Sequence, residues 1–334
     1  MKSIRIDGKE DVKVITSELK QELRSDECLM KCHKSLISPG TELSRVYALK
    51  KGATYPVSPG YCSVGTVLEL GKDVKDVELQ ARYLYSAPHA SMHHFNQLRS
   101  DGGVLYKLNE KTTDEEGCFL MMIWIAMNGI LPIDVKITDK VGIFGLGNLG
   151  LILTLLYKQM GCEVYAIDVA KNRCQKAEKL GIENIIDVAP EQQMEMILDK
   201  TEGHGFDVVV DASGMSRCIE VCFQAAARYG NVVLLGSPRE DYHCNVTPML
   251  NAIHMKMLNV VGGFNRRYPF SEEVGSKHSM QSTFKYLEKL LNEKIIDVNQ
   301  FVTHTIKPEE AMDAYRGLMY DKDNYLGVII DWEE

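Results

Sequence analysis

The feature that most constrains this chain is a glycine-rich turn, Gly145–Gly150, with the sequence Gly-Leu-Gly-Asn-Leu-Gly. An apolar run at 140–144 precedes the turn, and a helical pattern at 148–160 follows it. A second apolar run at 163–167 then leads to Asp168, 18 residues after the last glycine. A strand, a tight turn, a helix and a second strand ending in an acid are the context that a dinucleotide-binding turn requires.

Each glycine of the turn has a predicted purpose. Gly145 permits the sharp bend, Gly147 lets the backbone approach a pyrophosphate, and Gly150 lets the helix pack closely on the strand. The helix N-terminus adds a partial positive charge that attracts the anion. We predict further cofactor contacts at Asn148, Leu149 and Gly236. The competing interpretation is a glycine-rich turn that arises by chance, with Asp168 as a solvated strand end.

Asp168 bears on which dinucleotide is bound. A carboxylate at the end of the second strand can accept hydrogen bonds from the adenosine ribose diol, and its charge repels a 2′-phosphate. Arg173, five positions later, weakens this preference only slightly, because it can pair with Asp168 or pack beside the adenine. The predicted cofactor is therefore NAD.

The chain divides into three zones. Residues 1–121 are predicted to form strands and turns, residues 122–266 alternate short apolar strands with helices, and residues 267–334 contain two helical patterns and a closing strand. Alternating strands and helices indicate an α/β fold with a doubly wound parallel sheet. The length of 334 residues agrees with about two domains.

Composition excludes several classes of protein. With 45% hydrophobic residues the chain can bury a sizeable core, and its net charge of −8 disfavours nucleic-acid and anionic-membrane partners. The nine cysteines are odd in number and scattered, unlike a disulfide scaffold, and the N-terminus lacks a continuous apolar core. The apolar stretch 118–133 is too short for a membrane span and is predicted to be a buried helix. We expect a cytoplasmic protein with reduced thiols.

Four segments resemble the medium-chain dehydrogenase/reductase family, the zinc-type alcohol and polyol dehydrogenases. They are the turn at 37–42, the segment Pro59–Val67, the return at 262–264 and the closing segment 301–315. The resemblance implies a Rossmann domain (122–266) inserted in a mostly β, GroES-like catalytic domain (1–121 and 267–334). It also implies a possible homodimer through the edge strand that contains Val260 and Val261.

The chain departs from that family at its metal sites. The positions that match the catalytic zinc ligands hold Pro39, Tyr61 and Met121, none of which is a good zinc ligand. The four closely spaced cysteines of the structural zinc site are missing. The Ser-Pro-Gly-Thr-Glu motif resembles a zinc-less subgroup, and we predict no metal.

Two further groups of residues resemble metal ligands, but neither is expected to bind a metal. Cys28, Cys32 and His33 have a metal-like spacing, but the two cysteines alternate along a predicted strand and are expected in the core. His93 and His94 are expected on opposite faces of a strand, so they do not form a zinc site with His89.

Four residues are candidates for catalysis without a metal. The resemblance makes Thr41 a hydroxyl relay, and Tyr61 is expected to point to where the metal would lie, where its phenol can donate to the substrate oxygen. Glu42 is expected to hydrogen-bond Tyr61, which suits the phenol to act as an acid. His89, at the tip of a turn, is the next candidate for proton transfer. The competing interpretations are a Thr41 that satisfies a turn, a Tyr61 that fills the vacated pocket and a His89 that serves packing.

The sequence thus predicts an NAD-dependent dehydrogenase that interconverts a small secondary alcohol (polyol, cyclitol or sugar-like) and a ketone without zinc. A reductase of conjugated C=C bonds, as among enone and quinone reductases, is one alternative, although such enzymes often use NADPH. A cofactor-binding protein that has lost catalysis is another. Residues Asn265, Arg266 and Arg267 could meet an anionic or polyhydroxylated substrate or form a solvated turn.

Overall fold

The computed structural model describes residues 1–19, 22–98 and 103–333. The chain forms two compact units. Unit 1 comprises Met1–Trp124 and Tyr268–Glu334, and unit 2 comprises Ile125–Arg267. The polypeptide thus leaves unit 1, forms the whole of unit 2 and returns to complete unit 1.

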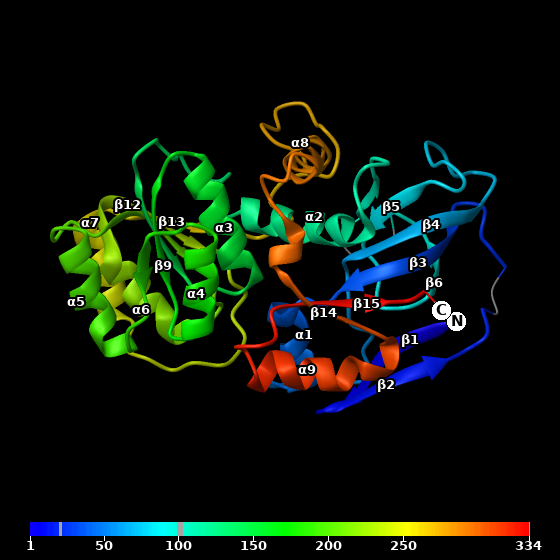
Figure 1. The fold of residues 1–334 in the computed structure, drawn as a ribbon, viewed down its shortest axis with the longest axis horizontal. Helices are drawn as coiled ribbons and strands as arrows, with labels where there is room; N and C mark the ends of the chain where they lie inside the picture. Colours follow the sequence, from blue (N-terminus) through cyan, green and yellow to red (C-terminus); the bar gives the residue numbers. More distant parts are fainter. Residues whose placement is uncertain (20–21, 99–102, 334) are drawn as a thin grey trace. The chain divides into compact units, whose positions relative to one another are not determined.

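Unit 2 is a sheet of six parallel strands in the order β10-β9-β8-β11-β12-β13; β9, β12 and β13 are labelled in Figure 1. The strands are β8 (Lys140–Phe144), β9 (Glu163–Ile167), β10 (Asn184–Ile186), β11 (Phe206–Asp211), β12 (Ala226–Leu234) and β13 (Asn259–Gly262). The connecting helices are α3 (Asn148–Gln159), α4 (Lys171–Lys179), α5 (Pro190–Lys200), α6 (Ser216–Ala225) and α7 (Thr247–Lys256). This doubly wound arrangement confirms the predicted fold class.

Unit 1 is built on a second, mainly antiparallel sheet. Seven strands pair in the order β14-β15-β3-β4-β5-β7, with β6 on β3, and β1 and β2 form a separate hairpin. The strands are β1 (Lys2–Gly8), β2 (Asp11–Thr16), β3 (Cys28–Leu36), β4 (Ser63–Leu70), β5 (Arg82–Tyr85), β6 (Met92–Phe95), β7 (Leu105–Lys107), β14 (Val302–Ile306) and β15 (Gly327–Asp331). Cys28, Met30 and Cys32 lie buried along β3, as the alternation predicts.

Unit 1 also contains helices: those that begin before residue 121 correct the expectation of strands and turns alone there, whereas those after residue 267 agree with the two helical patterns expected there. The helices are α1 (Pro39–Val46), α2 (Asp114–Met127), α8 (Met280–Asn292), α9 (Ala311–Tyr320) and the 3₁₀ turns η1 (Val298–Gln300) and η2 (Pro308–Glu310). The start of α1 follows an ordinary rule that the sequence reading missed, with proline in the first turn and Glu42 near the positive helix end. The helix predicted over 118–133 ends at Met127, and turns follow at Asn128, Gly129 and Ile130.

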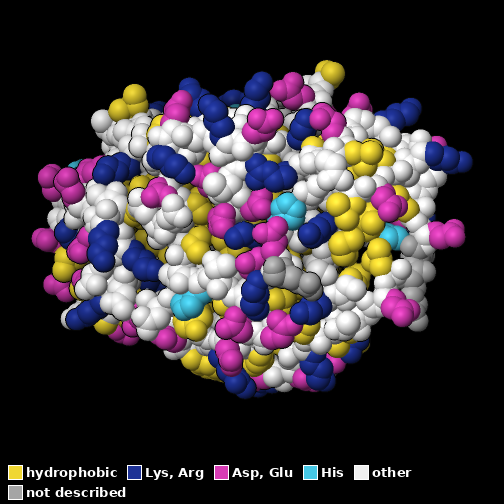
Figure 2. Space-filling model, turned by 45° about the vertical axis from the view of Figure 1, so that its right-hand side comes forward, with side chains coloured by type: hydrophobic (Ala, Val, Ile, Leu, Met, Phe, Trp, Pro, Cys, Tyr) yellow, Lys and Arg dark blue, Asp and Glu magenta, His cyan; other side chains and the backbone are white. Residues whose placement is uncertain are grey.

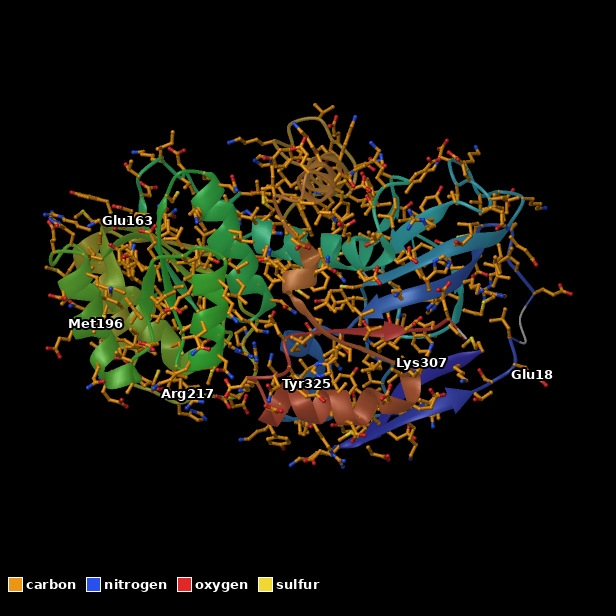
Figure 3. All side chains as sticks on the ribbon, in the orientation of Figure 1. Glu18, Glu163, Met196, Arg217, Lys307 and Tyr325 are labelled. Carbon is orange, nitrogen blue, oxygen red and sulfur yellow. The ribbon has the colours of Figure 1, made fainter. Side chains whose placement is uncertain are left out.

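Helices α1 and α9 pack on one another in unit 1 (Figure 1). Tyr325, labelled in Figure 3, lies against α9, because a Cβ at Gly317 would stand 2.4 Å from the Tyr325 Cζ. The Tyr325 ring also stacks on His304 of β14, with ring centroids 3.9 Å apart. These contacts fix α9 against the sheet, and α9 carries a residue of the site described below.

Among the helices that the structure describes, none is both long enough and apolar enough to cross a membrane. On the face drawn in Figure 2, basic and acidic side chains are interspersed. All nine cysteines are free thiols, seven of them buried.

Candidate active site

The glycine turn of unit 2 has the geometry that the sequence predicts. Gly145 has φ +93°, which a glycine adopts without strain, and a Cβ on Gly150 would lie 1.8 Å from the Gly145 carbonyl oxygen. At Gly147 the same test finds no atom within 4 Å. Gly145 and Gly150 are therefore required by the packing of the turn, whereas Gly147 leaves its backbone open to a ligand at the start of α3.

The other candidate cofactor residues follow the carboxyl ends of the same sheet. Phe144, Ile167, Asp211 and Leu234 stand in one register row across β8, β9, β11 and β12. Gly145 follows the first of these residues, Asp168 the second, and Gly236 comes two positions after the last. Ligands of open α/β sheets bind at this edge, so the fold brings the predicted residues to one place.

Asp168 is tied to the turn itself. Its Oδ2 accepts a hydrogen bond from the Leu146 N–H at 2.7 Å, and its Oδ1 accepts one from the Ala170 N–H at 2.9 Å. Arg173 of α4 places Nη1 3.8 Å from Asp168 Oδ2. Each carboxylate oxygen still has a lone pair for a ribose hydroxyl. The residues present therefore fit a dinucleotide.

Packing, as well as access for a ligand, requires a glycine at position 236. Its N–H donates to the Asp211 carbonyl at 2.7 Å, and a Cβ there would lie 2.2 Å from the Gly214 nitrogen. Asn148 is buried at the first position of α3, and Leu149 is half-buried beside it. Asn265, Arg266 and Arg267 lie in the turn that closes unit 2, with both arginines exposed.

In unit 1 the candidate catalytic residues meet around α1. Tyr61 is half-buried, and its hydroxyl lies 2.6 Å from Ser38 Oγ. Burial raises the pKa of Tyr61 well above its usual range, and the Ser38 and Thr41 hydroxyls act in the opposite direction without reversing the shift. The phenol is therefore neutral and can donate a hydrogen bond. Thr41 lies in the first turn of α1 and is exposed, so it is neither in a strand nor in the kind of turn that the competing interpretation expects.

Ser38 is the residue that sequence reasoning missed. A serine before a helical proline is a normal N-cap, whose hydroxyl is expected to bond the helix backbone. Here the Ser38 side chain makes no capping bond, and its hydroxyl contacts Tyr61 instead. The signal was the Ser-Pro-Gly-Thr-Glu motif, but the partner comes from a segment 23 positions away.

Glu42 does not make the predicted hydrogen bond to Tyr61. The carboxylate is 2% exposed, and three other groups donate to it. Oε1 accepts from the Ser38 N–H at 2.7 Å, and Oε2 accepts from the Tyr315 hydroxyl at 2.5 Å and contacts His89 Nε2 at 3.1 Å. Burial and the Glu42 carboxylate both raise the pKa of Tyr315 far above its usual range, so that phenol remains a donor.

His89 is not at an exposed turn tip. Its side chain is 0% exposed, and both ring nitrogens have partners, since Nδ1 lies 2.8 Å from Ser35 Oγ and Nε2 contacts Glu42. The Trp332 Nε1–H donates to the same Ser35 Oγ at 2.9 Å. A buried polar network of five side chains from four parts of the chain thus lies beneath Ser38.

The residues at the three family ligand positions do not fit a zinc ion. Pro39 begins α1, the Tyr61 hydroxyl is bonded to Ser38, and Met121 is buried within α2. Zinc is held in proteins by thiolate, imidazole or carboxylate ligands. Within residues 1–19, 22–98 and 103–333, no three such side chains are grouped to hold a metal.

Comparison with known proteins agrees with this architecture. A family model described as "Zinc-binding dehydrogenase" matches residues 148–282. Human sorbitol dehydrogenase is 26% identical over 214 residues, covering 63% of this chain and 55% of that protein. The zinc-type alcohol dehydrogenase-like protein YdjJ of Escherichia coli is 23% identical over 90% of this chain and 80% of its own length. The matched part thus spans just over half of the sorbitol dehydrogenase.

The solved structure of galactitol-1-phosphate dehydrogenase from Escherichia coli superposes with a TM-score of 0.83 at 18% identity. The match covers 99% of this chain and 100% of that one, and it shows the fold. The glycine turn, the inserted parallel sheet and the matching sequences agree with one another. The chain is thus similar in sequence to zinc-type alcohol and polyol dehydrogenases, and it has the fold of the galactitol-1-phosphate dehydrogenase.

Proposed function

We propose that the protein is an NAD-dependent oxidoreductase that interconverts a secondary alcohol and a ketone without a catalytic zinc. The substrate is a polyol, a cyclitol or a similar sugar-like molecule. The observation that carries the proposal is the Tyr61–Ser38 pair, whose oxygens lie 2.6 Å apart. By the sequence resemblance, Tyr61 matches a position that holds a zinc ligand in zinc-type dehydrogenases. A neutral phenol can polarise a carbonyl and move a proton, which are the tasks otherwise given to the metal.

The hydroxyl groups of unit 1 provide the proton path. During ketone reduction the Tyr61 phenol donates to the substrate oxygen, and Ser38 Oγ–H donates to the phenolic oxygen, since either oxygen of this pair can be the donor. During alcohol oxidation the donors reverse: the substrate hydroxyl proton passes to the Tyr61 oxygen, the phenol proton passes to Ser38 Oγ, and the Ser38 hydroxyl proton passes on toward solvent. Thr41 is exposed beside this pair and connects it to solvent. The raised pKa of Tyr61 makes a free phenolate rare at neutral pH, so the proton moves in a concerted relay.

Unit 2 would hold the cofactor through residues already placed at one sheet edge. The open backbone at Gly147 and the start of α3 receive the pyrophosphate, and Asp168 receives the ribose diol. A bound nicotinamide supplies the acceptor for the hydride. The Asp168 carboxylate repels a 2′-phosphate, which supports NAD over NADP.

The test is NAD⁺ reduction, followed by absorbance at 340 nm over a panel of polyols and cyclitols, with metal analysis of the same enzyme. We expect turnover with less than stoichiometric zinc and no loss on treatment with a chelator. Tyr61→Phe should lower kcat by about 100-fold, since one positioned proton donor contributes 10²–10⁴. Stoichiometric zinc required for turnover would contradict the metal-free part of the proposal.

The same assay separates the alternatives. Faster consumption of NADPH with an enone than of NADH with any ketone would favour the C=C reductase. Tight NADH binding without turnover of any substrate would favour a binding protein. The buried carboxylate with its three donors argues against decay, because an unused polar network in a core costs stability.

We further propose a homodimer formed through β13 in the reducing cytoplasm. β13 is the edge of the parallel sheet, and Asn259, Val260 and Gly262 along it are exposed. An exposed apolar edge strand is a template for pairing with a second copy. The free thiols support a reducing location. Light scattering should report twice the chain mass, and Val261→Pro should yield monomers because proline removes a ladder hydrogen bond.

A further inference from the structure

His89 connects the two segments that carry the Tyr61–Ser38 pair. On the Tyr61 side, the His89 N–H donates to the Pro59 carbonyl at 2.7 Å, and the ring lies against Gly60. A Cβ on Gly60 would stand 2.7 Å from the His89 Cγ, and Gly60 has φ +104°. The ring therefore has its place only because this residue is a glycine. On the other side, His89 Nε2 contacts Glu42 of α1.

The direction of the hydrogen bonds follows from the donors at each end. The Trp332 indole can only donate, so Ser35 Oγ accepts from it at 2.9 Å and has its own proton to give. The remaining contact of that hydroxyl is His89 Nδ1 at 2.8 Å, which then accepts. The His89 proton therefore lies on Nε2, where it faces the Glu42 carboxylate. A proton on Nδ1 instead would set the Nε2 lone pair against an anionic oxygen.

We propose that His89 is a positioning residue, neutral with its proton on Nε2, which holds Glu42 and the Tyr61 segment together and takes no part in proton transfer. Glu42 in turn accepts the Ser38 N–H and fixes the first turn of α1. Through Glu42 on one side and Pro59 on the other, His89 thus holds Ser38 and Tyr61 at their oxygen–oxygen distance of 2.6 Å. This inference rests on the proposed function only in assigning the pair to catalysis.

Two amide substitutions separate positioning from proton transfer. In His89→Gln the side-chain amide reaches the place of Nε2 and still donates to Glu42, whereas in His89→Asn the amide reaches only the place of Nδ1 beside Ser35. We expect His89→Gln to keep kcat within about 3-fold and His89→Asn to lower it by about 10- to 100-fold, the range for groups that orient a reacting side chain. The pH profile of kcat should keep its shape in both, because neither change removes a titrating catalyst.

Equal large losses in both variants, with one limb of the pH profile gone, would show that His89 transfers protons. Unchanged kcat in both would show that it only fills space. NADH binding, measured by fluorescence, monitors the folding of unit 2 in each variant and should equal that of the wild type. In His89→Asn we expect KM to change less than kcat, because the groups that contact the substrate remain in place.

A second measurement is independent of activity. In protein labelled with ¹⁵N-histidine, the His89 signals, identified by their loss in His89→Gln, should show the neutral Nε2–H tautomer at pH 7. His243, which is exposed, serves as the contrast, because its ring is not held in one tautomer by buried partners. A charged ring or an Nδ1–H tautomer would overturn the inference even if the enzyme oxidises polyols. An enzyme that oxidises no alcohol but shows the tautomer would overturn the proposed function alone.

Discussion

The two units build their candidate sites from different materials. In unit 2 the site is backbone, formed by six consecutive residues whose glycines are fixed by a positive φ at Gly145 and a close contact at Gly150. In unit 1 the site is a set of buried side chains drawn from segments as far apart as Ser35 and Trp332. A backbone site leaves a local pattern in the sequence, whereas a side-chain network of this kind leaves none.

The difference extends to how each site tolerates change. At the glycine turn, a substitution that adds side-chain atoms should destabilise the fold, because the backbone is already in close contact. Around Glu42, a substitution that removes the charge should destabilise the fold, because three donors converge on one buried carboxylate. A buried group whose partner is removed costs the full penalty of its desolvation. The following substitutions test these two modes of failure.

The largest effect is expected at Gly150. Gly150→Val would place its Cβ 1.8 Å from the Gly145 carbonyl oxygen, a contact that only a backbone shift can relieve. Overpacking of this kind costs about 3 kcal/mol or more of unfolding free energy. Urea unfolding measures the loss, and NADH binding should vanish with it.

Gly147→Ala is the matched control in the same turn. Its Cβ meets no atom within 4 Å, and the Gly147 φ of −73° suits any residue, so stability should remain within about 0.5 kcal/mol. NADH affinity should nevertheless fall by about 10-fold, because the methyl group occupies the approach to the backbone. Equal stability losses in the two variants would refute the distinction between a packing glycine and a ligand glycine.

The next effect is expected at Glu42. Glu42→Gln keeps the shape but turns an amide donor toward one of the three donors, which should cost about 3 kcal/mol in urea unfolding. Glu78→Gln is the control, because Glu78 pairs with Lys107 on the surface, with side chains 66% and 49% exposed, and should change stability by less than about 1 kcal/mol. Similar values for both would mean that the buried network contributes no more than a surface ion pair.

A smaller effect is expected at Asp168, because its side chain both bonds the backbone beside the glycine turn and carries the charge proposed to select the cofactor. Asp168→Asn keeps a side-chain oxygen for only one of the two backbone N–H donors, and it loses the negative charge expected beside the ribose. NADH affinity should fall by about 10-fold, roughly 1.4 kcal/mol, while NADPH affinity holds or rises. Titration of the two cofactors by fluorescence gives the ratio. An unchanged preference would show that Arg173 or another group, and not the carboxylate, selects the cofactor.

The sequence predicted unit 2 closely because its signals are local. The strands at 140–144 and 163–167 agree with the expected residues, since short apolar runs in a parallel sheet are bounded by glycine and charge. In unit 1 the residues Glu42, Tyr61 and His89 were singled out, but Ser38 and Tyr315, which contact Tyr61 and Glu42, were not. Ser38 was missed because helix capping alone explains a serine at that position. Tyr315 was missed because its phenol reaches Glu42 from 273 positions away. Tertiary contacts of that kind have no period or spacing to detect.

The smallest effect is expected in the pH dependence of stability, which should distinguish the buried Cys62 thiol from the exposed Cys244 thiol. Burial, and then the nearby Glu42 carboxylate, raise the pKa of Cys62 well above that of a free thiol, so above about pH 9 the unfolded chain loses a proton that the native protein keeps. Since the unfolded state then binds fewer protons, stability falls as pH rises, by about 1.4 kcal/mol per pH unit for each such group. Cys62→Ala should reduce the slope of Tm between pH 9 and 10, whereas Cys244→Ala, at an exposed thiol, should leave it unchanged. Because the slope and not the level is compared, the packing lost with the Cys62 sulfur does not enter, and equal slopes would place the Cys62 thiol in contact with water.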